Sequence, residues 1–114
     1  MYRRCALAAA SLALACSLAA SAEPDAKLVK LWKAKCASCH GVDGKAKTET
    51  GTKLGIPDMT TAGWQKKVTD AVAKQSIQKG VKREGKAEGM DPYEDKLTPE
   101  QIDGLITVVR SFGK

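Results

Sequence analysis

The reactive side chains of residues 23–114 are concentrated in one short motif. Cys36, Cys39 and His40 lie within five consecutive positions, and residues 23–114 contain no other cysteine or histidine. Two cysteines three positions apart on a helical turn present both sulfur atoms to one edge of a flat ring. Cys-x-x-Cys-His is an attachment signal for haem c, and histidine nitrogen is a standard ligand of haem iron. The motif therefore predicts one covalently attached haem c, with His40 as the proximal ligand.

Other uses of paired cysteines fit this chain less well. A structural zinc site needs about four cysteine or histidine ligands, and this motif supplies three. A thioredoxin-like pair belongs to a βαβ fold, but the sequence shows no strand pattern. A disulfide between Cys36 and Cys39 would close a very small loop and stabilise little. We therefore favour haem attachment over a zinc, redox-thiol or disulfide role.

The first 22 residues have the layout of a secretory signal peptide. Two arginines near the start precede an apolar run over 5–18, and small residues ending at Ala22 form a cleavage site. The run is too short for a good transmembrane helix. Cleavage after Ala22 removes the two arginines and no acidic residue, which lowers the formal net charge from +6 to +4. We predict a signal peptide over 1–22 and a single domain over 23–114.

Two alternatives for the leader stay open. The segment could remain uncleaved as an N-terminal anchor. It could instead be a lipoprotein signal, in which Cys16 becomes the lipidated N-terminus. We expect a periplasmic or otherwise exported protein, which would be membrane-anchored and face the periplasm only if Cys16 is lipidated.

Helical patterns flank the motif. Asp25 is a suitable N-cap for a helix over 26–37, and Thr69 with Asp70 opens another over 70–79. Thr98, Pro99 and Gln101 predict a capping box at the start of a last helix that runs to 112. One face of this last helix is apolar and carries Ile102, Leu105, Ile106, Val109 and Phe112.

The remaining segments, 41–63 and 80–97, read as irregular. The first contains six glycines or prolines, so we predict a long loop with little regular structure. Such a loop is unusual inside a compact domain, unless it wraps a cofactor. The chain is also short and has few aromatic residues, at 4%. A domain with so thin a core usually needs a stabilising cofactor, metal or disulfide.

Together these features resemble the class I, mono-haem cytochrome c family. The likeness covers most of residues 26–113: a helix running into the motif, a proline-containing loop, a middle helix, a methionine loop and an amphipathic last helix. The resemblance implies an all-α cytochrome c fold of three to four helices around the haem, with the first and last helices crossed. In that arrangement Leu28, Leu31 and Trp32 would meet Leu105, Val109 and Phe112.

The resemblance also bears on the other face of the iron. A methionine sulfur is the family's usual second ligand, and Met90 lies in a loop before the last helix, although Asp91 stands where proline is more common. In the family a loop proline carbonyl accepts a hydrogen bond from the proximal histidine, a role that Pro57 matches best. That would leave Met59 on the wrong face, so we predict His40/Met90 ligation.

Other roles remain open for the residues near the predicted haem. If Met90 is the iron ligand, Met59 would fill a gap in the core or at the haem edge. Met90 could instead be an ordinary loop residue, with the iron five-coordinate or bound by water or lysine. Trp64 could donate its indole N–H to a haem propionate, as a tryptophan does in some relatives, or simply pack on the haem. We expect Tyr93 to pack beside the methionine loop.

The function implied is that of a single-electron carrier and not of an enzyme. Methionine ligation would leave no open iron position for a substrate, although the domain could also serve as a subunit of a larger oxidoreductase or as a five-coordinate sensor. The many lysines could simply keep the surface soluble, or steer weak, transient docking to acidic surfaces of redox partner proteins. We expect no nucleic-acid partner, because the chain has no aromatic or arginine-rich patch.

Overall fold

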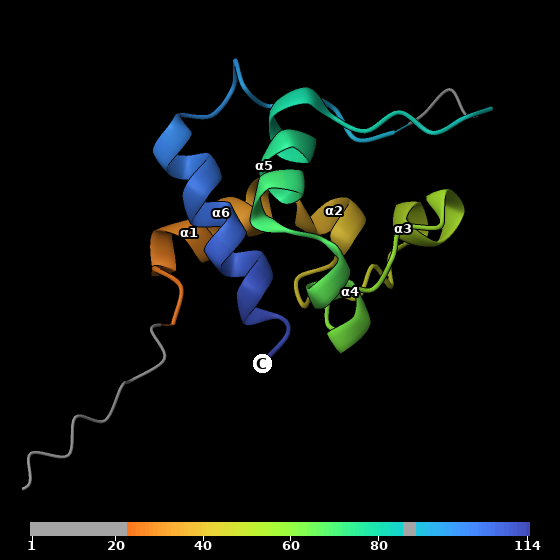
Figure 1. The fold of residues 1–114 in the computed structure, drawn as a ribbon, viewed down its shortest axis with the longest axis horizontal. Helices are drawn as coiled ribbons and strands as arrows, with labels where there is room; N and C mark the ends of the chain where they lie inside the picture. The colour runs from red at the N-terminus through yellow and green to blue at the C-terminus, as the bar shows by residue number, and fades with distance from the viewer. Residues whose placement is uncertain (1–22, 86–88) are drawn as a thin grey trace, which may run out of the picture.

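The computed structural model describes residues 23–85 and 89–114 (Figure 1). The predicted signal peptide, with Cys16, lies outside the described residues. Within these ranges, none of the helices has both the length and the apolar character needed to cross a membrane.

Helices account for the regular structure of the described residues, which confirms the predicted all-α fold. They are α1 (Ala26–Lys35), α2 (Ala37–His40), α3 (Glu49–Leu54), α4 (Ala62–Lys67), α5 (Asp70–Lys79) and α6 (Pro99–Ser111). The strand-like feature in the described ranges is an isolated antiparallel bridge between Val81 and Met90. Three of the helices, α1, α5 and α6, are 10 residues or longer.

Local capping explains where the helices begin. The side chain of Asp25 accepts a hydrogen bond from the Lys27 N–H at the start of α1. Thr98 accepts from the Gln101 N–H, while the Gln101 side chain accepts from the Thr98 N–H, so the predicted capping box is confirmed. The predicted helix over 70–79 is likewise confirmed as α5.

The prediction of a long irregular loop over 41–63 is wrong in part. This stretch contains α3 and the beginning of α4. Thr48 caps α3 by accepting from the Gly51 N–H, and Gly55 ends it in the left-handed conformation, with φ of 63°. Thr61 caps α4 in the same way, through the Trp64 N–H. Helices of six residues are too short to show a hydrophobic period, so the glycines dominated the sequence pattern.

The core forms where α6 crosses α1, as the family resemblance implies (Figure 1). Trp32 of α1 is 3% exposed and Leu105 of α6 is 1% exposed. Leu28, Leu31 and Phe112 pack against the same cluster. The two helices approach closely because position 104 is a glycine, and a Cβ atom there would collide with the Leu28 side chain.

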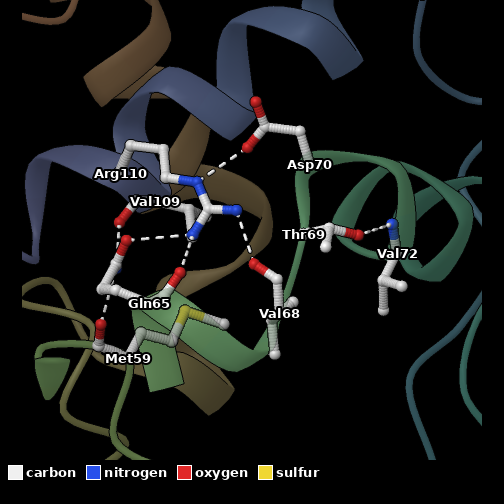
Figure 2. A network of polar contacts seen from close by, with 8 residues as sticks. All are labelled: Met59, Gln65, Val68, Thr69, Asp70, Val72, Val109 and Arg110. Atoms are coloured by element: carbon white, nitrogen blue, oxygen red, sulfur yellow. Dashed lines mark hydrogen bonds and ion pairs between the residues drawn. The ribbon is translucent and has the colours of Figure 1, made fainter. Parts of the chain in front are cut away.

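A polar network ties α6 to the segment that carries α4 and the start of α5 (Figure 2). Arg110 donates through Nη1 to the Gln65 carbonyl at 3.0 Å and through Nη2 to the Val68 carbonyl at 2.6 Å. Its Nε lies 2.7 Å from a carboxylate oxygen of Asp70. The Gln65 side chain donates in turn to the carbonyls of Met59, at 2.7 Å, and Val109, at 2.9 Å. Arg110 and Gln65 together therefore hold the chain between Met59 and α5 against the last helix.

Substituting Gly104→Ala tests the close approach of α1 and α6. We expect Gly104→Ala to lose the roughly 1 kcal/mol that such a change usually gains inside a helix, because the added methyl group must displace the half-buried Leu28 side chain. Gly63→Ala in α4 is the matched control, since a Cβ there meets nothing within 4 Å. The control should leave stability unchanged or raise it. Urea unfolding of both variants measures the difference, and equal stabilities would contradict this account of the crossing.

Substituting Arg110→Met tests the network. The change leaves partly buried carbonyls at Gln65 and Val68 without their charged donor, so we expect a loss of roughly 2–3 kcal/mol in the free energy of unfolding. Asp70→Asn removes the ion pair alone. It should cost less than about 1 kcal/mol, because the Asp70 side chain is 71% exposed. If the two variants lose the same stability in urea, the carbonyl contacts are not what stabilises this interface.

Candidate functional site

The Cys36–His40 motif forms a helical turn, as its spacing predicts. The Cys36 N–H donates to the Trp32 carbonyl at 2.8 Å and so continues α1 into the motif. The His40 N–H donates to the Cys36 carbonyl at 2.9 Å within the turn that α2 forms. Both thiols are free and half-buried. Burial, with a contribution from the nearby Cys39, raises the pKa of the Cys36 thiol to about 11, so this thiol is protonated at neutral pH.

His40 follows the second thiol and lies mostly in the interior. Burial lowers the pKa of its imidazole, which favours the neutral form that binds metals. Its Nδ1 atom is buried and has no hydrogen-bond partner in the described ranges. The predicted bond from this ring to the Pro57 carbonyl is thus not formed in this structure and stays a prediction for the haem-bound protein. Pro57 does line the same cavity as His40.

Trp32 supports the histidine from the core side. Its ring centroid lies 5.7 Å from that of His40, and its indole Nε1 donates to the Gly41 carbonyl at 2.9 Å. The apolar spacing of α1 predicts Trp32 as a core residue but does not reveal this bond. The available signal is chemical, because a buried indole N–H usually finds an acceptor.

Residues in the loop after the motif donate hydrogen bonds to the carbonyls at the end of the turn. The His40 carbonyl accepts from the Ala46 N–H at 2.8 Å, and the Cys39 carbonyl accepts from the Thr48 hydroxyl at 2.8 Å. Gly51 of α3 packs so closely that a Cβ atom would collide with the same Cys39 carbonyl. The sequence pattern did not identify Thr48 or Gly51 as residues that shape the site.

A cavity of about 330 Å³ opens beside the motif. Every residue predicted to contact the haem lines it: Cys36, Cys39, His40, Pro57, Trp64 and Met90. Most of the other lining side chains are apolar, including Leu54, Ile56, Val72, Ile77 and Val109. Cofactor sites are typically apolar clefts of this size with a few polar groups. Which of the two roles Trp64 plays, propionate donor or packing residue, stays open.

The two methionines reach the cavity from different segments. Met59 is 8% exposed and belongs to the core cluster that contains Trp32. Its N–H donates to the Gly44 carbonyl at 2.9 Å, and its carbonyl accepts from Gln65 (Figure 2). Met90 lies after α5 and pairs with Val81 through two backbone hydrogen bonds, each 2.9 Å long.

Tyr93 anchors the segment that follows Met90. Its N–H donates to the Ile77 carbonyl of α5 at 2.9 Å, and its hydroxyl donates to the Lys35 carbonyl at 3.3 Å. The ring lines the cavity, and burial raises the pKa of its hydroxyl. Tyr93 therefore lines the same cavity as Met90 and connects the segment after Met90 to α1 and α5.

This arrangement fits a covalently attached haem. Two free thiols stand one helical turn apart, a half-buried imidazole with a lowered pKa and a buried Nδ1 follows them, and an apolar cavity lies beside all three. His40 has an unused buried ring nitrogen, as expected of a ligand whose outer partner forms only in the complete site.

Comparisons with known proteins agree with this fit. The family model described as "Cytochrome C oxidase, cbb3-type, subunit III" matches residues 23–107. The solved structure of the KustC0563 c-type cytochrome is 40% identical, covering 75% of this chain and 96% of that chain with a TM-score of 0.67. A tyrosine-to-phenylalanine mutant of that cytochrome matches with the same identity and coverage and a TM-score of 0.63. No curated protein sequence matches. The family match spans most of the chain and the fold agrees with it, so this chain belongs to the mono-haem c-type cytochromes and carries covalently attached haem c.

Proposed function

We propose that the protein is an exported single-electron carrier whose haem iron is held by His40 and Met90. The haem supplies the redox chemistry, since its iron changes between the ferrous and ferric states by one electron. The chain's residues attach the haem, set its axial ligands and exclude water from it. The observation that carries the proposal is that His40 and Met90 line one cavity from separate segments, while Met59, which also lines this cavity, is buried in the core cluster with Trp32.

The surroundings of the two methionines favour Met90 as the distal ligand. Met59 is bonded to Gly44, in the loop that leaves His40, and shares the core with Trp32, which packs on the His40 ring. These contacts associate Met59 with the proximal side. Met90 instead belongs to the segment after α5, whose anchors are Val81 and the Ile77 carbonyl. A thioether from that segment would complete the iron's coordination and raise its reduction potential.

Closed coordination supports electron transfer over catalysis. An enzyme that transforms a substrate at haem iron needs an open coordination position, which a bound Met90 would occupy. The description of the matching family names a subunit of a cytochrome oxidase. A second candidate function is therefore electron entry within a larger oxidoreductase, in which the same domain passes electrons to a neighbouring subunit.

Features of the sequence support the proposed location and partners of the carrier. The predicted signal peptide over 1–22 supports export to the periplasm, and lipidation at Cys16 would keep the domain at the membrane. The chain without this leader has a formal charge of +4, and lysines such as Lys45, Lys66 and Lys82 are exposed. This charge favours weak, salt-sensitive docking to an acidic face of a redox partner.

Optical spectra of the haem-loaded protein test the ligand assignment. We expect the ferric form to show the weak far-red band of methionine-ligated haem. Met90→Ala should abolish this band, lower the reduction potential and allow the ferrous iron to bind carbon monoxide, because it removes the thioether ligand. Met59→Ala should keep the band but lower the free energy of unfolding by about 2–5 kcal/mol, as for other large-to-small changes in a core. A high-spin spectrum with carbon monoxide binding in the unmodified protein would contradict the carrier proposal.

A further inference from the structure

Arg83 joins two segments that line the haem cavity and that are far apart in the sequence. Its guanidinium donates through Nη2 to the Gly55 carbonyl at 3.1 Å and through Nη1 to the Leu54 carbonyl. Both acceptors lie at the end of α3, 28 and 29 residues before Arg83. In Figure 1 the segment after α5 runs out toward α3, and these contacts connect the two. Arg83 also lines the cavity itself.

The end of α3 provides a firm attachment point. Leu54 is 8% exposed and lines the cavity, as do Ile56 and Pro57 immediately after it. The last carbonyls of a helix have no partner within it, so they are natural acceptors for a cation near the C-terminus. The guanidinium of Arg83 occupies this position with two donors, which a single ammonium group could not place in the same way.

Arg83 is also connected to Met90, through the backbone of Val81. Arg83 follows Val81 by two residues, and Val81 exchanges both of its backbone hydrogen bonds with Met90. The pairing is tight, because a Cβ atom at Gly80 would collide with the Met90 carbonyl and one at Gly89 would collide with the Val81 carbonyl. The backbone of Met90 therefore cannot move away from Val81 without breaking this pair, and Val81 is held near α3 through Arg83.

We propose that Arg83 is a positioning residue that keeps Met90 in the cavity by fastening the Val81–Met90 pair to the end of α3. The inference rests on the proposed ligation by Met90. When Arg83 is present, release of the thioether requires the Val81–Met90 pair to move against two charged hydrogen bonds. When it is absent, the same movement meets less resistance, so an external ligand competes more easily for the iron.

Titration of the ferric haem-loaded protein with imidazole tests this role, because imidazole replaces a weak methionine ligand. We expect Arg83→Met to lower about tenfold the imidazole concentration at which half of the protein has lost its Met90 ligand. This is the effect of losing one to two charged hydrogen bonds. The half-displacement concentration of Arg83→Lys should lie between those of Arg83→Met and the unmodified protein. Lysine keeps the positive charge but cannot donate to both carbonyls with the geometry of a guanidinium. Lys82→Met is the matched control, because it removes the same charge from an exposed neighbour and should leave the titration unchanged.

The same titration in a Met90→Ala background separates holding the ligand from gating the cavity. With no thioether to hold, Arg83→Met should change imidazole affinity by less than about twofold. An undiminished effect in that background would overturn the proposal, and so would equal effects of Arg83→Met and Lys82→Met. A loss of stability toward urea with unchanged imidazole affinity would show a merely structural residue and also overturn it. Failure of the Met90 ligation itself would appear separately, as a missing far-red band in the protein without substitutions.

Discussion

Hydrogen bonds to the backbone oxygens of residues 39–41, where the Cys36–His40 turn ends, hold the surrounding structure together. A helix of four residues leaves its carbonyls without partners inside the helix, and each buried one must find a donor elsewhere. Here the Cys39 oxygen takes the Thr48 hydroxyl, the His40 oxygen takes the Ala46 N–H, and the Gly41 oxygen takes the Trp32 indole. The first helix and the loop leading to α3 are therefore both tied to the end of the Cys-x-x-Cys-His motif.

The rest of the core is arranged around that turn. Trp32 packs on His40 on one side and lies 5.1 Å from the Phe112 ring, between centroids, on the other. Through these contacts α1 supports His40 directly, and Phe112, which follows α6, supports it through Trp32. The side chains that face the cavity are mostly apolar, so a covalently attached haem buries surface that a chain of this size could not cover alone. The cofactor is thereby part of the hydrophobic core as well as the redox centre.

The two methionines have unequal support. Met59 is enclosed by the core, and both its N–H and its carbonyl are hydrogen-bonded. The donor to its carbonyl, Gln65, also accepts a hydrogen bond from Arg110 of α6. Met90 depends on a single backbone pair with Val81 and on side chains such as Tyr93 and Arg83 that connect its segment to other parts of the fold. Segments held by few contacts open most readily. An axial ligand on such a segment needs fastening by specific residues, and this is the physical setting of the Arg83 proposal.

The sequence by itself determined the features that depend on neighbouring residues. The Cys36–His40 spacing predicts the site of haem attachment, and Asp25 and Thr98 mark where α1 and α6 begin. Such signals work because a cap, a helical turn and an apolar face involve residues only a few positions apart. The prediction failed for α3, since a six-residue helix among glycines has too few apolar positions to show a period.

Only the tertiary structure decided which distant residues support the site. The indole of Trp32 reaches a carbonyl 9 residues away, the Gln65 amide reaches one 44 residues away, and Arg83 reaches one 28 residues away. None of these pairs has a sequence pattern, because a tryptophan, a glutamine or an arginine can donate to any carbonyl that folding brings within reach. The six predicted haem-contacting residues were found from their order along the chain, but their meeting in one cavity is a result of how α1, α3, α5 and α6 pack.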